Sequence, residues 1–342
     1  MRLHAYADVP LSKYEVTPDT DEAMQEIAAR FEVTHRHGNS FEIIVPQNRA
    51  NELRGLSPNA RLILKDLRDE IKGRLLDDPE WFAGYHNFES VQAYLRSVAE
   101  QYPTLAKTEV YGTSKQGRPL LALKLSDNVH LNEAEPEIMI TSATHGDELI
   151  TVEVVLGVIK SLLEGYGKVD RVTRMIEGKQ LYFIPVVNPD GYVAQSRYAN
   201  GVDPNRDYPW PERPDRNPVD CIRHLIAFFH QHDFKGSIDY HAFGQLIMYP
   251  WAYTYDSVES FEERQFEELT GPMAQTNGYT AGQISKVIYV AKGSSADYFF
   301  WKNKTKALGI EIGRSKVPHS SQIASQINEN LESTWRFIEY FN

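Results

Sequence analysis

The chain has 342 residues, of which 42% are hydrophobic and 24% are charged, and its formal net charge is −11 at pH 7. This composition is ordinary for a folded globular protein and excludes collagen-like, low-complexity and disordered chains. Nucleic-acid affinity depends on positive charge, so the acidic balance argues against a general nucleic-acid binder or an anionic-membrane binder. The single cysteine, Cys221, permits neither an internal disulfide nor a thiolate cluster around a metal. At about 150 residues per domain, we expect one large domain or two unequal ones.

Residues 1–78 have the pattern of a small α+β domain. Acidic residues at 19–22 open a predicted helix, whose apolar side chains Met24, Ile27 and Phe31 recur on one face. The charged segment 71–82 is the expected linker, so we place the domain boundary between residues 78 and 79. A second short helix is expected at residues 48–53. Three strands complete the unit, at residues 3–9, 41–45 and 61–67.

In residues 79–342, predicted helices alternate with predicted strands. This order indicates an α/β domain with a mixed, largely parallel central sheet and helices on both faces. The helices are expected at residues 88–101, 147–163, 218–232, 258–277 and 321–341. The strands are expected at residues 107–113, 119–125, 136–142, 180–186, 236–241 and 306–312.

Nothing in the sequence predicts a membrane span. A spanning helix needs about 18 uninterrupted apolar residues, and the best candidate, residues 149–163, is interrupted by Glu153 and Lys160. The first six residues lack the apolar central region of a secretory signal. The protein is therefore expected to be cytoplasmic if Met1 is the native start, and secreted or periplasmic if a signal has been trimmed. The oligomeric state is not indicated.

The strongest chemical signal is a pair of polar residues that follow a strand. The apolar strand at 137–143 ends just before His145 and Glu148, and a helix begins there. Imidazole nitrogen and carboxylate oxygen suit zinc, and a catalytic zinc takes three protein ligands and a water. His241 closes the strand at 236–241 and is the candidate third ligand. A His-x-x-Glu pair also arises by chance, but both histidines close apolar strands, where a packed core histidine would be unusual.

Four further motifs follow in chain order. A strand runs into a turn at residues 184–192, and a short loop then carries Arg197 and residues 201–206. Later come the segment 288–298 and an apolar strand that contains Glu311. With this collinear set, the chain resembles the zinc metallocarboxypeptidases of the carboxypeptidase A/B type from about residue 85 to its end.

The resemblance implies a zinc-dependent exopeptidase that removes the C-terminal residue of peptides or proteins. One Zn²⁺ per chain would be held by His145, Glu148 and His241. The N-terminal unit is similar in size and pattern to the family's activation segment. On that reading it covers the active site until cleavage near Lys72 or Arg74 releases it; the alternative is a permanent accessory domain.

The resemblance also assigns roles around the metal. Glu311 matches the carboxylate that takes a proton from the zinc-bound water and passes it to the leaving amine. Arg197 matches the arginine that stabilises the oxyanion of the tetrahedral intermediate. Asp203 matches a carboxylate that fixes the ring of His145, although an Asx-turn before Pro204 explains an aspartate there equally well.

The same resemblance predicts how substrate is held. Asn205, Arg206 and Tyr289 match the groups that bind the free C-terminal carboxylate, for which an arginine provides a bidentate fork. The pocket for the terminal side chain should be lined by Asp239, Met248, Ala252, Ile284, Ala291, Ser294, Ala296 and Gly309.

Several of these pocket positions are small, and one of them is acidic. A buried carboxylate favours a cation, so we expect Asp239 to give a preference for a basic terminal residue. Alternatively, Asp239 pairs with a local lysine or backbone groups, and the pocket prefers bulky apolar residues. The chain departs from the family pattern at Asp147, where many members carry arginine, and at Phe243, where tyrosine is common.

Three other functions remain open from the sequence. The chain can be a cell-wall peptide carboxypeptidase, or a zinc amidase that acts on small acylated amino acids. Less consistent with the complete set of site residues is a catalytically inactive zinc-binding homologue.

Overall fold

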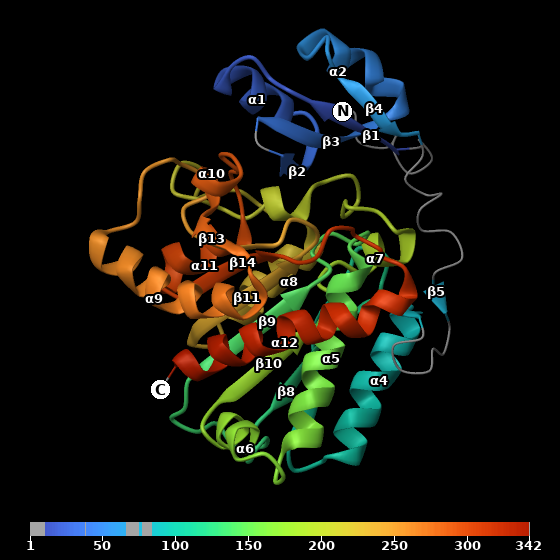
Figure 1. Ribbon diagram of the computed structural model, residues 1–342. Helices are drawn as coiled ribbons and strands as arrows, with labels where there is room; N and C mark the ends of the chain where they lie inside the picture. The colour runs from blue at the N-terminus through green and yellow to red at the C-terminus, as the bar shows by residue number, and fades with distance from the viewer. Residues whose placement is uncertain (1–10, 38, 66–74, 77–83, 342) are drawn as a thin grey trace.

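The computed structural model describes residues 11–37, 39–65, 75–76 and 84–341. A small N-terminal unit lies over one end of a larger α/β domain (Figure 1). No helix in these described ranges is long and apolar enough to cross a lipid bilayer. The strand expected at 3–9, the candidate cleavage sites Lys72 and Arg74, and the boundary expected after residue 78 all lie outside the described residues.

The N-terminal unit is a four-stranded sheet, in the order β2-β3-β1-β4, with two helices. Its neighbouring strands are antiparallel. The helices bury Met24, Ile27 and Leu53 against the sheet, as their apolar spacing predicts. The elements are β1 (Leu11–Val16), α1 (Asp21–Ala28), β2 (Glu32–His37), β3 (Ser40–Pro46), the 3-10 turn η1 (Gln47–Arg49), α2 (Ala50–Leu56) and β4 (Arg61–Leu64).

The larger domain contains an eight-stranded mixed sheet, in the order β13-β12-β14-β11-β9-β10-β8-β7. The central strands β14, β11, β9 and β10 are parallel to one another. At one end of the sheet, β8 pairs antiparallel with β10, and β7 pairs antiparallel with β8. This confirms the predicted fold class. The strands are β7 (Ala106–Thr113), β8 (Pro119–Leu125), β9 (Glu137–Ser142), β10 (Gln180–Ile184), β11 (Phe234–His241), β12 (Leu246–Tyr249), β13 (Thr280–Gln283) and β14 (Lys306–Glu311). A separate short parallel pair joins β5 (Leu75–Leu76) to β6 (Tyr85–His86).

Helices cover both faces of this sheet. Alternate strand residues point to opposite faces, so Ile138 and Ile140 pack in one core with α4, α5 and α12, while Met139 packs in the other with α8 and α11. The helices are α4 (Phe88–Gln101), α5 (Leu149–Gly165), α6 (Asp170–Glu177), α7 (Pro189–Ala194), α8 (Asp220–Phe229), α9 (Ser260–Asn277), α10 (Ile284–Val287), α11 (Ser295–Asn303) and α12 (Ile323–Tyr340). Two 3-10 turns are η2 (Pro204–Arg206) and η3 (Ser320–Gln322).

Candidate metal centre and substrate pocket

Three strand ends meet at the carboxyl edge of the central sheet. β9 lies between β10 and β11, and all three run parallel, so the segments that follow β9 and β11 emerge side by side. His145 and Glu148 follow the end of β9, and His241 is the last residue of β11. Their side chains are 3%, 2% and 4% exposed, so the three polar groups face one another away from water.

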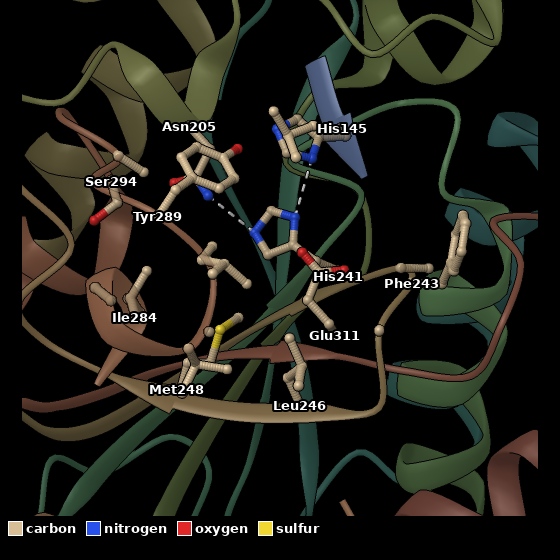
Figure 2. A pocket seen from close by; sticks show the side chains of 18 of the residues that line it. His145, Asn205, His241, Phe243, Leu246, Met248, Ile284, Tyr289, Ser294 and Glu311 are labelled. Carbon is tan, nitrogen blue, oxygen red and sulfur yellow. Dashed lines mark hydrogen bonds between the residues drawn. The ribbon is translucent and has the colours of Figure 1, made fainter. Parts of the chain in front are cut away.

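The ligand atoms of these three residues lie within 4.8 Å of one another. Glu148 Oε1 is 2.9 Å from His145 Nδ1, and Glu148 Oε2 is 3.1 Å from His241 Nδ1. The two Nδ1 atoms are 3.1 Å apart, and Figure 2 shows the rings turned toward each other. Two imidazole nitrogens and a carboxylate at this spacing form a donor set that suits zinc.

The outer nitrogens of both rings face carboxylates. His145 Nε2 is 3.1 Å from Asp203 Oδ1, and His241 Nε2 is 3.0 Å from Asp239 Oδ2. In the tautomer that binds a metal, each ring donates its Nε2 proton outward to a carboxylate and presents the Nδ1 lone pair inward. Two Nδ1 lone pairs and the Glu148 carboxylate then face one point, so the residues fit a divalent metal.

A close backbone approach fixes the loop that carries the first two ligands. At Gly146, a Cβ atom would lie 2.1 Å from the carbonyl carbon of Gly191, in the first turn of α7. Only glycine fits between the ligands and that helix. The preceding Ala143 has φ 45°, so the chain turns sharply at the end of β9 before it reaches His145.

The Asp203 carboxylate lies between the His145 ring, the following backbone turn and Arg197. Its Oδ1 atom lies near His145 and also accepts a hydrogen bond from Asn205 N at 3.0 Å, which is an Asx-turn. Its Oδ2 atom is 2.8 Å from Arg197 Nη2. Burial alone would raise the pKa of Asp203, but Arg197 and His145 outweigh burial and hold the pKa well below its ordinary value.

Arg197 lies against the ligand triad. It is 4% exposed, and its Nη1 atom is 3.1 Å from His145 Nδ1 and 3.7 Å from Glu148 Oε1. The ion pair with Asp203 holds the guanidinium plane in place. A fixed positive charge therefore stands beside the position that a metal would occupy.

Glu311 closes β14, directly opposite His241 in the parallel register of β11 and β14. Its side chain lines the same cavity as the ligands (Figure 2). Among the described residues, its buried Oε2 atom has no hydrogen-bond partner. Burial, followed by the Glu148 carboxylate, raises the pKa of Glu311 to about 7. A carboxylate of this kind, aimed into a cavity, has the properties of a general base.

Asn205, Arg206 and Tyr289 come together on the other side of the cavity. Arg206 Nη2 donates to Tyr289 Oη at 2.7 Å, and the guanidinium lies over the Tyr289 ring. Asn205 Oδ1 accepts from the backbone N–H of Ser295 at 2.9 Å, which orients its amide. All three residues line the cavity, so their donors converge on one region.

The cavity has a volume of about 430 Å³. Six of the eight predicted pocket residues line it: Met248, Ile284, Ala291, Ser294, Ala296 and Gly309. Sequence reasoning missed several further apolar residues of the lining, including Leu246, Val287 and Ile288. The short helix α10 contains Ile284 and Val287, which are three residues apart, and this spacing was the available signal.

Asp239 and Ala252 do not belong to the cavity lining, which corrects the prediction for both. The Asp239 carboxylate turns away from the cavity to hydroxyl groups and the His241 ring. Burial alone would raise the pKa of Asp239, but His241, Ser295 and Thr144 outweigh burial and lower it. The expected preference for a basic terminal residue thereby loses its structural basis.

Nothing in the sequence indicated a partner for Asp147. Asp147, which departs from the family pattern, forms an ion pair with Lys316. The Lys316 Nζ atom lies 2.8 Å from Asp147 Oδ2 and 3.8 Å from Glu148 Oε1. The N-terminal unit was expected to cover the active site, and two of its residues, Val33 and Phe41, line the cavity.

Comparisons with known proteins give a consistent result. The sequence profile of the zinc carboxypeptidase family matches residues 91–333. A zinc carboxypeptidase of Saccharothrix mutabilis subsp. capreolus is 29% identical over 311 residues, which cover 77% of this chain and 71% of the relative. Mouse carboxypeptidase A4 is 26% identical over 290 residues, covering 74% and 68% of the two chains.

The fold has counterparts among solved structures. The crystal structure of carboxypeptidase A from Helicoverpa armigera superimposes with a TM-score of 0.81 at 18% identity and covers 98% of each chain. At this identity the likeness establishes the fold alone, and it extends over the N-terminal unit as well as the larger domain.

Proposed function

This chain belongs to the zinc carboxypeptidase family, whose profile spans most of its α/β domain, and we propose that it hydrolyses the last peptide bond of peptides with Glu311 as general base. One observation carries the proposal: a two-histidine, one-glutamate ligand set shares a cavity with the Glu311 carboxylate. His145, Glu148 and His241 would hold the metal. When bound, zinc lowers the pKa of a water molecule and polarises the scissile carbonyl.

The protein's own residues handle the protons and the developing charge. Glu311 accepts a proton from the attacking water at Oε2 and donates it to the departing amine nitrogen. Arg197, held rigid by Asp203, stabilises the negative charge that appears on the carbonyl oxygen in the transition state. Because this charge is small in the ground state, the arginine lowers the barrier more than it strengthens substrate binding.

Recognition of a free C-terminus is assigned to Asn205, Arg206 and Tyr289. A substrate carboxylate would accept hydrogen bonds from all three, and an amidated or internal residue would leave buried donors unpaired.

Paired peptides with free and amidated C-termini test this recognition. Release of the terminal residue should be about 10⁴-fold faster from the free form, and Arg206→Met should remove most of that difference. Equal cleavage of both peptides by the unaltered protein would contradict the proposal and favour the amidase alternative.

For the terminal side chain, the apolar lining supports a bulky apolar residue. Among the described lining residues, the only carboxylates are Glu148 and Glu311. Glu148 is assigned to the metal and Glu311 is the proposed general base, so neither is left to pair with a basic side chain of the substrate. Hydrolysis of hippuryl-Phe should therefore exceed that of hippuryl-Arg by at least about tenfold. The variant Ala296→Asp, which adds a carboxylate to the lining, should shift the ratio toward arginine. Faster cleavage of hippuryl-Arg by the unaltered protein would overturn this specificity.

The N-terminal unit is proposed to restrict access to the cavity. Val33 and Phe41 form part of its wall, and the Lys13 ammonium lies 4.9 Å from the centre of the Phe243 ring. Trypsin cleavage near Lys72 or Arg74 should raise the rate on a small substrate, and the paired substitution Lys72→Gln with Arg74→Gln should block the rise. An unchanged rate after complete cleavage would favour a permanent accessory domain.

A further inference from the structure

Asp239 is a buried carboxylate whose oxygens accept hydrogen bonds from several hydroxyl groups. It is 4% exposed. Thr141 Oγ1 and Thr144 Oγ1 each lie 2.9 Å from Oδ1, and Ser295 Oγ lies 2.9 Å from Oδ2. These hydroxyls come from three separate places in the chain: β9, the loop after β9, and the start of α11. They fix the carboxylate in one orientation.

That orientation points Oδ2 at the outer nitrogen of a metal ligand. His241 Nε2 lies 3.0 Å from it. With its other acceptor positions taken by hydroxyls, the carboxylate receives the ring proton at Nε2 and thereby keeps the Nδ1 lone pair of His241 free. Asp203 stands in the same relation to His145, so each imidazole is backed by its own carboxylate.

A second group competes for the same ring nitrogen. Asn205 Nδ2 lies 3.2 Å from His241 Nε2, and the amide is held by its Oδ1 bond to Ser295 N. The amide nitrogen can donate to Nε2 only if the ring proton moves to Nδ1, where it would block the metal. The Asp239 carboxylate disfavours that arrangement, because it accepts the proton at Nε2.

We propose that Asp239 is a positioning residue that holds His241 in its metal-binding tautomer, against the tautomer that the Asn205 amide would favour. The proposal rests on the zinc-dependent function above. It gives Asp239 no part in choosing the terminal residue of the substrate.

The variant Asp239→Asn tests the proposal because it keeps the shape of the side chain and removes its charge. Zinc affinity, measured by competition with a chromophoric chelator, should fall about tenfold to hundredfold. At saturating zinc, kcat and KM should return toward those of the unaltered protein, because zinc on Nδ1 itself then keeps the ring proton on Nε2. The ratio of hippuryl-Phe to hippuryl-Arg hydrolysis should stay the same.

A matched control is Asp190→Asn. Asp190 is also a buried carboxylate, 5% exposed, but it binds Ser114 and Arg118 instead of a ligand ring. Its variant should keep the zinc affinity of the unaltered protein. If Asp239→Asn also keeps that affinity, or if it changes the Phe-to-Arg ratio at full zinc affinity, the positioning role is wrong.

The unaltered protein provides a second measurement that does not depend on the folding of a variant. In the zinc-loaded protein, proton NMR with ¹⁵N-labelled histidine should show two slowly exchanging Nε2 protons far downfield, one each for His145 and His241. A single such proton, assigned to His145, would overturn the proposal while leaving zinc binding and hydrolysis intact. Failure of the unaltered protein to bind zinc at all would instead contradict the proposed function.

Discussion

At the scale of single residues, opposing interactions act on the pKa of Glu311. Burial and the Glu148 carboxylate raise its pKa to about 7, while His241, His145 and Arg197 act in the opposite direction. A divalent cation at the ligand triad would lower this pKa further, because positive charge favours the ionised form. The base in the loaded enzyme should therefore titrate below pH 7.

The first prediction concerns pH. A general base works only when it is deprotonated, so kcat/KM should rise as pH increases through the pKa of Glu311. The acid limb of the profile should have its midpoint below pH 7, which is the upper end of the window to be measured. Steady-state rates on a neutral peptide, at constant zinc saturation, provide the measurement. A profile that is flat across this window would contradict the assignment.

The second prediction is for Glu311→Gln, which keeps the shape of the side chain and removes the proton acceptor. We expect kcat to fall by about 10²- to 10⁴-fold, together with loss of the acid limb. Zinc content, measured by atomic absorption, should stay at one per chain because Glu311 is not a ligand. A variant that loses its metal would mean that Glu311 helps to hold the ion.

At the scale of elements, one close contact joins two of the helices that cover the sheet. A Cβ atom at Gly157, in the middle of α5, would lie 2.5 Å from Ile327 Cγ2 on α12. The two helices approach closely because position 157 carries no side chain.

The third prediction follows from that contact. Alanine is about 1 kcal/mol better than glycine within a helix, but overpacking costs about 1–3 kcal/mol. Gly157→Ala should therefore lower the free energy of unfolding in urea. In combination with Ile327→Ala, the added methyl group should occupy part of the new cavity, so the double variant should lose less than the sum of the single losses. Strict additivity would show that the contact is not direct.

Elements with a long periodic pattern could be predicted, and short ones could not. The residues of α4 agree with the predicted helix, and β8 agrees with the predicted strand. β12 and β13 have four residues each, which is too short for an alternating pattern to stand out. β2 contains the sequence EVTHRH, which has few apolar residues, so nothing in it indicates a strand.

The metal triad was predictable because both histidines stand at the ends of apolar strands. The surroundings of the triad were harder, because hydrogen-bonded contacts between distant segments have no sequence period. Asp239 illustrates this. The sequence predicts that it lies in a strand, but only the three-dimensional structure shows that its carboxylate accepts hydrogen bonds from Thr144 and Ser295.

At the scale of the whole molecule, the metal links activity to stability. The ligands belong to β11 and to the loop after β9, both in the centre of the sheet. A ligand that binds only the folded protein stabilises it, by about 4 kcal/mol when its concentration is 1,000 times Kd.

The fourth prediction is that chelation removes activity and lowers Tm together, and that added zinc restores both. Calorimetry and rate measurements on the same samples provide the test. Full activity after complete removal of metal would contradict the metal-dependent mechanism. Loss of activity with no change in Tm would contradict the link between the metal and folding.

The register between β11 and β14 has a further consequence. His241 and Glu311 are opposite residues on adjacent parallel strands, so their backbone separation equals the distance between neighbouring strands, about 4.8 Å. Insertions or substitutions in the loops around the cavity leave this separation unchanged. Evolution can therefore alter which peptides enter without rebuilding the machinery that cuts them, and a protein engineer can do the same.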